Sequence, residues 1–387
     1  MNMYTIAVIF SVMLYSFGNN TQGILLSNYA EYYHLTSLSQ GAISAFQSLG
    51  MILAMLFLLF GKGKLSKSRL LMLGLAAVAV SFGALYLAPP FFVFLVCYFC
   101  IGAAYGNIDS VSSSLMADMH SGRHASRYMG VLHSAIGIGG MIGPLFIQFL
   151  LGKKVAWNCI LGIFSFIALA VFLLNATSYC KAKAKLPVQN VHGSSLNMSD
   201  IKKFLTPQNL FILFSVAFYG AHQICIVFWI ARFVKLTFGS ERLGAFAVSL
   251  FWVGTVISRF TVPFLPMKTE HYISRAMLIT TVVLGASVLA RSAYEMCAVM
   301  FAAGLIGGAV IPMGLHDLCK KFSQNTLLVS AMVLLSVYGM QMISSLLTGA
   351  IGSSDTLWTV IAIAMAFGLI SSSCAYGYRI KMDRAKK

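Results

Sequence analysis

Asp109 is the residue whose type and position point most directly to chemistry. It stands inside an apolar run, and its helical neighbours three and four positions away are Tyr105, Gly106, Ser112 and Ser113. A carboxylate at the centre of a membrane-spanning helix costs about 3 kcal/mol, so such a residue needs a function or a partner. On a small, polar face an acid can bind a substrate or carry a proton. The alternative is a structural salt bridge or hydrogen bond between helices.

A second group of polar side chains stands at the start of the second half of the chain. Tyr219, His222 and Gln223 share one face of a predicted helix, and Trp229 follows His222 by seven residues, or two turns. Amides, hydroxyls and an aromatic ring are typical of sites that bind polar organic solutes. Histidine also changes its charge near physiological pH, so His222 is a second candidate for proton coupling. Polar contacts between helices are again the alternative.

The composition indicates which elements must position these residues. Of 387 residues, 59% are hydrophobic and 10% are charged, and the mean hydropathy is +0.84. A soluble domain carries roughly a quarter of charged residues, so this chain is predicted to lie in a membrane. The net charge of +17 does not indicate a nucleic-acid partner, because the basic residues cluster between apolar runs. The eight cysteines are scattered, mostly within apolar stretches, and are read as small core residues and not as a disulfide framework.

Charges and turn residues divide the sequence into twelve predicted spans in two groups of six. A polar linker at 177–207 separates an N-terminal bundle, 1–176, from a C-terminal bundle, 208–387. With both termini in the cytoplasm, twenty Lys and Arg residues lie inside and six lie outside, which is the expected bias. The first run is read as a retained helix. The predicted spans are 3–26, 38–60, 69–88, 91–115, 127–151, 155–175, 208–235, 241–264, 273–290, 294–318, 326–350 and 355–378.

The two groups of spans resemble each other. The residues Phe10, Ser11, Val12 and Tyr15 recur 204 positions later as Phe214, Ser215, Val216 and Tyr219. The pair at 41–42 recurs 203 positions later at 244–245. Parallel repeats of this kind are found in one major class of transporters, with the substrate near the midplane. The same shift aligns Asn19 with Gln223, so the amides Asn19, Asn20 and Gln22 are predicted to share a central site with the His222 group.

Further residues complete the candidate site. Tyr105, Trp252, Tyr338 and Gln341 are candidate substrate contacts because they are polar or aromatic residues within predicted spans. A second set is read as gating or structural, since glycine allows helices to approach closely and proline bends them. These residues are His133, Gly139, Gly143, Pro144, Arg259 and Asp317.

Three segments carry a family resemblance. Residues 102–109 form a glycine-rich stretch that ends in Asp109, residues 133–144 read His-x-x-x-Gly-x-Gly-x-x-x-Gly-Pro, and residues 251–260 join Phe-Trp to Arg259. Together with the six-plus-six layout, these motifs resemble the major facilitator superfamily, and its fucose-permease-like sugar and solute symporters above all. The resemblance implies an all-α membrane fold of two pseudo-symmetric six-helix bundles that exposes a central site to each side in turn. The loop at 61–69 keeps the first glycine and the basic residues of the superfamily's pattern but lacks its aspartate.

The sequence therefore predicts a proton-coupled secondary transporter for a small polar solute, such as a sugar, working as a monomer in the bacterial inner membrane. Two alternatives stay open. Gly130, Gly139 and the Gly143-Pro144 pair also fit most of the pattern of drug/proton antiporters, and a receptor that does not transport is a third reading. No motif for nucleotide binding, for metalloprotease or for serine-hydrolase chemistry is present, so neither an enzyme nor a cofactor is predicted.

Overall fold

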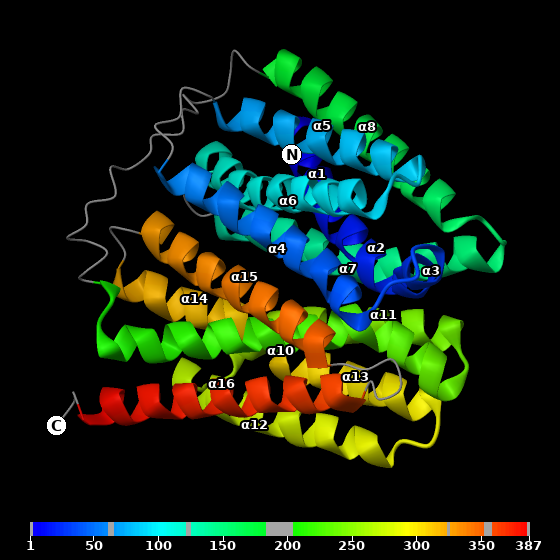
Figure 1. Cartoon of the computed structure of the whole chain (residues 1–387). Coiled ribbons are helices and arrows are strands. Elements are labelled where there is room, and N and C mark those ends of the chain that lie inside the picture. Colours follow the sequence, from blue (N-terminus) through cyan, green and yellow to red (C-terminus); the bar gives the residue numbers. More distant parts are fainter. Residues whose placement is uncertain are drawn as a thin grey trace. The chain divides into compact units, whose positions relative to one another are not determined.

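The structure is a computed structural model that describes residues 3–60, 66–120, 125–182, 204–322, 326–351 and 358–384. Within these residues, helices occupy every predicted span (Figure 1). In this described part of the chain, eleven helical segments are long and apolar enough to cross a membrane. The remaining one, α1, has 17 residues, and its apolar run continues through the two short helices that follow it. The expected linker begins inside α8, and its residues 183–203 lie outside the described part.

The helices of the first half of the chain follow the predicted spans closely. They are α1 (Met3–Asn19), α2 (Thr21–Ile24), α3 (Leu26–Tyr32), α4 (Ser37–Phe60), α5 (Lys67–Tyr86), α6 (Phe91–Met119), α7 (Ala125–Gly152) and α8 (Trp157–Ala182).

The second half contains a similar series with short 3-10 extensions. Its elements are α10 (Pro207–Phe238), α11 (Glu241–Thr261), η3 (Val262–Phe264), α12 (Thr269–Ala286), η4 (Ser287–Leu289), α13 (Ala293–Gly307), α14 (Val310–Lys321), α15 (Thr326–Ile351) and α16 (Trp358–Arg384). Capping explains several boundaries. Thr206 and Ser240 accept hydrogen bonds from the backbone three residues on, at the starts of α10 and α11.

Two predicted spans are interrupted in the structure. The first run breaks at Asn20, where the side chain donates to the Ser16 carbonyl at 3.0 Å, and Thr21 donates to the Gly18 carbonyl at 2.8 Å. Such bonds from short polar side chains compete with the helical ladder and bend it. The span predicted at 294–318 divides into α13 and α14 after Gly307. Two successive glycines, Gly307 and Gly308, weaken the helix there.

The chain forms two compact units. The first comprises Met1–Asn28 and Phe46–Ser194, and the second comprises Tyr29–Ala45 and Ser195–Lys387. The start of α4 therefore belongs to the second unit, where Ser345 of α15 donates a hydrogen bond to Ser44 at 3.0 Å.

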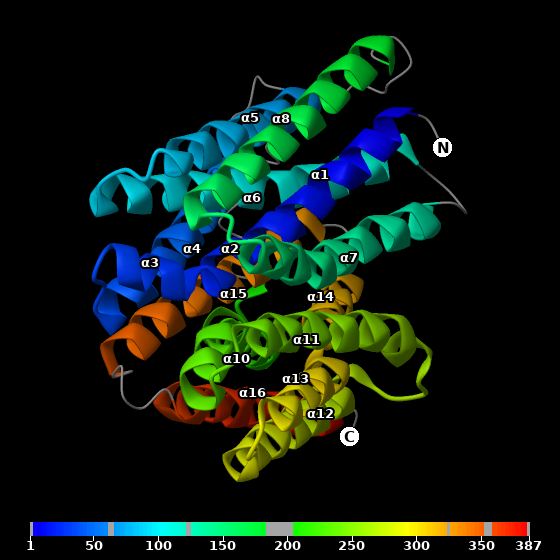
Figure 2. The same ribbon diagram turned by 90° about the vertical axis from the view of Figure 1, so that its right-hand side faces the viewer.

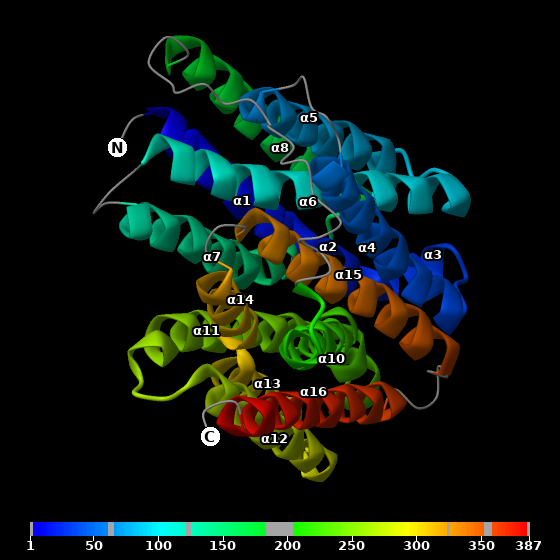
Figure 3. The same ribbon diagram turned by 90° about the vertical axis from the view of Figure 1, so that its left-hand side faces the viewer.

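Each unit is organised around its own helix contacts. In the first unit α1 lies beside α7 and α8, and α5 lies beside α6 and α8 (Figure 2). In the second unit α10 lies between α15 and α16, while α11 packs on α13 and α12 on α16 (Figure 3).

Both units use the same glycine-based helix crossing. In the first unit, a Cβ built on Gly50 of α4 would lie 2.7 Å from the Ala103 nitrogen, and one on Gly102 of α6 would overlap the Gln47 carbonyl. In the second, a Cβ on Gly254 of α11 would lie 2.6 Å from the Leu305 nitrogen, and one on Gly304 of α13 would overlap the Phe251 carbonyl. Gly254 and Gly304 stand 204 and 202 residues after Gly50 and Gly102. The sequence repeat is therefore also a repeat of backbone packing.

Candidate functional site

The break after α1 gathers amide side chains in the first unit. Gln47 of α4 is 3% exposed, and its Nε2 donates a hydrogen bond of 2.5 Å to Oδ1 of Asn19. Asn20 donates to the carbonyls of Ser16 and Gly140, at 3.0 and 3.5 Å. Buried Gln22 follows, and its Oε1 has no hydrogen-bond partner among the described residues. Asn19 is half-buried, and Gln47 holds its amide in place.

Tyr105 adds a hydroxyl to the first unit. A Cβ on Gly18 would overlap this hydroxyl, so Gly18 makes the room that the tyrosine occupies. The Tyr105 ring meets Tyr15 edge to face, with centroids 5.1 Å apart. Within the described part of the chain, the Tyr105 hydroxyl has no hydrogen-bond partner although the side chain is fully buried. Asp109 lies one turn further along α6 and is half-buried.

His222 and Tyr219 of α10 face the interior of the second unit. His222 is 1% exposed, and its Nδ1 lies 2.8 Å from the Ala364 carbonyl of α16. A carbonyl only accepts, so Nδ1 carries the hydrogen and Nε2 is left as an acceptor. The Tyr219 ring stacks on the imidazole with centroids 6.1 Å apart. Neither His222 Nε2 nor the Tyr219 hydroxyl finds a hydrogen-bond partner in the described residues.

Trp229 is engaged in packing α10 against α15. Its indole nitrogen donates to Thr348 at 3.1 Å, and one turn earlier Cys225 lies 2.8 Å from the Ser344 hydroxyl. A cavity of about 20 Å³ adjoins it, lined by residues that include Cys225, Trp229, Met296, Met300 and Ala364. The lining is apolar and the volume small, so this cavity does not suit a polar solute.

The other candidate contacts are distributed over the second unit. Gln223, Trp252 and Tyr338 are buried, and Gln341 of α15 is half-buried. The structure does not place these residues in direct hydrogen-bond contact with His222, whose described partner is Ala364.

The residues read as gating or structural take part in helix packing. Arg259 Nε donates to the Gly308 carbonyl at 3.3 Å, at the junction of α13 and α14. Asp317 accepts a hydrogen bond from Tyr378 of α16, and Lys321 donates to the same tyrosine.

In the first unit, α7 packs on α1 through two of its glycines. A Cβ on Gly139 would lie 2.5 Å from the Met13 carbonyl, and one on Gly143 would lie 2.6 Å from the Phe17 carbonyl. Pro144 lies inside α7. The side chain of His133 lies outside the described part of the structure.

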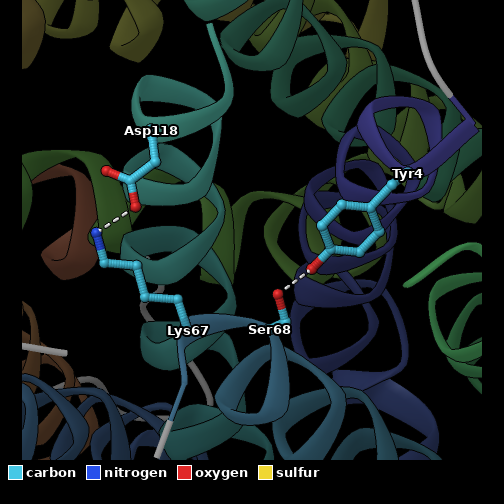
Figure 4. A network of polar contacts seen from close by, with 4 residues as sticks. All are labelled: Tyr4, Lys67, Ser68 and Asp118. Carbon is cyan, nitrogen blue, oxygen red and sulfur yellow. Dashed lines mark hydrogen bonds and ion pairs between the residues drawn. The ribbon is translucent and has the colours of Figure 1, made fainter. Parts of the chain in front are cut away.

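A polar network closes one end of the first unit (Figure 4). Lys67 at the start of α5 forms an ion pair of 2.7 Å with Asp118 at the end of α6. Beside it, Tyr4 of α1 donates to Ser68 at 2.7 Å. His120 follows, with Nε2 3.0 Å from the Thr5 hydroxyl, and burial lowers the pKa of His120. These contacts connect α1, α5 and α6. Lys67 and Ser68 belong to the segment 61–69, which lacks the aspartate expected from the family resemblance.

Gln47 is the contact that sequence reasoning missed. Gln47 is one of two glutamines in its predicted span, 38–60, and it belongs to no recognised motif. Its only indication was the cost of placing an amide in a membrane-spanning helix, which also applies to many structural residues.

Comparison with known proteins supports the fold and the general function. The model of the Major Facilitator Superfamily matches residues 8–291. A Protein TsgA homolog of Serratia proteamaculans is 22% identical over 244 residues, or 63% of this chain and 60% of the relative. A TsgA homolog of Yersinia pestis is 21% identical over the same shares. The matched region thus spans less than two thirds of these relatives.

Solved transporter structures are similar over nearly the whole chain. A crystal structure of the peptide transporter POT with sulfate has a TM-score of 0.79 and 13% identity, covering 99% of this chain and 95% of that one. A variant of the nucleoside transporter NupG has a TM-score of 0.76 and 13% identity, covering 98% and 99%. The predicted all-α membrane fold of two six-helix bundles is thereby confirmed.

Proposed function

The chain belongs to the Major Facilitator Superfamily, whose members carry solutes across membranes, and we propose that it is a proton-coupled secondary transporter for a small polar solute such as a sugar. We further propose that it works by alternating access. It would act as a monomer in the bacterial inner membrane, with both termini in the cytoplasm. The charge bias of the loops supports the orientation. The proposal includes no enzymatic activity.

The hydrogen bond from Gln47 to Asn19 is the observation that carries the proposed substrate class. It lies at a helix interruption, and interrupted helices are where transporters commonly place their sites. Neutral amides that are held in position offer both donors and acceptors, which suits the hydroxyls of an uncharged solute. Lipophilic cations are instead accommodated by flexible methionine and aromatic surfaces.

The amides of α1 and α2, Gln47 and Tyr105 are proposed to contact the substrate. Asp109 is proposed to couple transport to protons, because it is half-buried one turn from Tyr105. His222 is proposed as a second coupling residue rather than a substrate contact, because α16 accepts its Nδ1 hydrogen and the side chain is enclosed within its unit. Tyr338, Gln341 and Trp252 remain proposed contacts from the second unit.

Proteoliposome counterflow with a panel of sugars, nucleosides and organic acids tests the proposed function. A neutral polar solute should exchange without an ion gradient and should accumulate when a proton gradient is imposed. Transport of lipophilic cations in place of any polar solute would support the antiporter reading instead.

A further inference from the structure

The interior of the second unit contains a concentration of buried polar atoms. The hydroxyls of Tyr219, Thr255 and Thr280 and Nε2 of His222 have no hydrogen-bond partner among the described residues, and each side chain is at most 1% exposed. A buried polar group without a partner destabilises the folded state, and in native proteins ordered water usually satisfies it.

Three of these residues, Tyr219, Thr255 and Thr280, lie at the junction between α13 and α14. A Cβ on Gly307 would lie 3.2 Å from Cε2 of Tyr219 and 3.4 Å from Oγ1 of Thr280, so both side chains meet at this glycine. A Cβ on Gly308 would lie 2.6 Å from Cα of Thr255. Three helices thus direct hydroxyl-bearing residues to a place where the helical ladder is interrupted.

His222 supplies the complementary chemistry. Its Nδ1 donates to the Ala364 carbonyl, so Nε2 accepts, and its ring stacks on Tyr219. A hydroxyl both donates and accepts. A water molecule can donate a hydrogen bond to Nε2 and exchange hydrogen bonds with the neighbouring hydroxyls. Water forms about three hydrogen bonds in such sites.

The described charged and titratable groups that interact electrostatically with Tyr219 are Arg259 and Tyr272. Arg259 of α11 donates to the Gly308 carbonyl at 3.3 Å. Tyr272 of α12 donates to the Ile306 carbonyl at 2.8 Å. At this place α13 contributes glycines, and α16 contributes the Ala364 carbonyl.

We propose that Tyr219, His222 and Thr280 form an internal-water site in the second unit, beside the α13–α14 junction. This deepens the proposed function and rests on it in one respect, the coupling role of His222. Water is the species that would bring a proton there: a hydronium ion gives its proton to the lone pair of Nε2, leaving water and an imidazolium. The reverse step returns the proton.

Thermal unfolding of the detergent-purified protein tests the water site, because the direction in which Thr280→Val shifts the melting temperature depends on whether a water is bound. Thr280→Val keeps the shape and removes the hydroxyl. With a shared water, the melting temperature falls by about 2 °C, and combining Thr280→Val with Tyr219→Phe lowers it by less than the sum of the single changes. Without a water, the substitution removes a buried group that lacks a partner, so an unchanged or raised melting temperature, or strict additivity, would overturn the proposal.

Two further variants separate the site from general packing. Thr281→Val is the matched control, since its buried hydroxyl already bonds to the Met277 carbonyl at 2.8 Å, and it should not couple to Tyr219→Phe. His222→Asn keeps a donor for Ala364 but removes the Nε2 acceptor, and it should couple to Thr280→Val. Additivity in that pair would remove His222 from the site.

Transport distinguishes the water site from the proposed function. In proteoliposomes, Thr280→Val and His222→Asn should each reduce accumulation driven by a proton gradient by at least about tenfold, while substrate counterflow persists. Coupled melting shifts with unchanged proton-driven accumulation would support the water site and contradict proton coupling through His222.

Discussion

Gln47 of α4 donates a hydrogen bond of 2.5 Å to Asn19, the last residue of α1. The two residues are 28 positions apart and come from consecutive spans of one unit. A side chain that is 3% exposed thus positions a half-buried amide where the first span is interrupted. This relationship gives the proposed substrate site its geometry, and the first prediction tests it.

Gln47→Leu should weaken substrate binding while the protein stays folded. The substitution frees Asn19 to rotate, and losing one well-placed hydrogen bond to a polar solute is worth about 1–3 kcal/mol, or roughly 5- to 150-fold in KM. Counterflow as a function of substrate concentration measures the change. Gln148→Leu, which alters a half-buried glutamine of α7, serves as the matched control and should leave KM unchanged. Equal effects of both changes would contradict a special role for Gln47.

Asp109→Asn should separate exchange from accumulation. The amide preserves size and hydrogen bonding but cannot release a proton, so counterflow should persist while uptake driven by a pH gradient is lost. Uptake by the purified variant with and without an imposed gradient measures both activities. Full gradient-driven uptake by the variant would exclude Asp109 from proton coupling.

Gly102→Ala and Gly304→Ala should destabilise the two units in the same way. In each case the added Cβ overlaps a carbonyl oxygen of the facing helix, and strain of this kind costs about 1–3 kcal/mol. Thermal unfolding measures the loss. Gly339→Ala in α15 is the control, because its Cβ would meet no described atom within 4 Å, and it should be neutral or slightly stabilising. A stable Gly102→Ala variant would show that the helices can separate locally.

Lys67→Ala and Asp118→Ala should each have small effects that do not add. The pair lies at 2.7 Å, but the side chains are 19% and 30% exposed, so its contribution is no more than about 1 kcal/mol and decreases with salt. A double-mutant cycle at low and high ionic strength measures it. Exchange of the charges, Lys67→Asp with Asp118→Lys, should recover most of the stability. Additive effects at low salt would indicate that the pair contributes nothing.

Acid should weaken the folded state through His120. Burial lowers the pKa of this histidine in the folded protein, so the unfolded chain binds the proton more readily. The contribution of His120 is present above the unfolded pKa of about 6.5 and is lost as the pH falls below it. Melting temperatures between pH 7.5 and about 5.5 should therefore decline less steeply in His120→Gln than in the unchanged protein. Parallel profiles would contradict this assignment.

The sequence predicted the class and the spans well because apolar runs of about 20 residues have few alternative structures. Two aspects needed the structure. Hydropathy averages over a window, so the breaks at Asn20 and at Gly307 leave the predicted spans intact. Helical spacing placed Tyr219 and His222 on one face, but it could not show that Ala364 of α16 covers that face. Gln47 was not predicted to belong to the site because its hydrogen-bond partner, Asn19, lies 28 positions away in the sequence.

Substrate counterflow in proteoliposomes that contain only this chain tests the central claim most directly. The transport account predicts exchange of at least one small, neutral polar solute without ATP, together with a marked loss of affinity in Gln47→Leu. Absence of flux for every polar solute under all gradients, with a ligand still raising the melting temperature, would contradict it and favour a receptor.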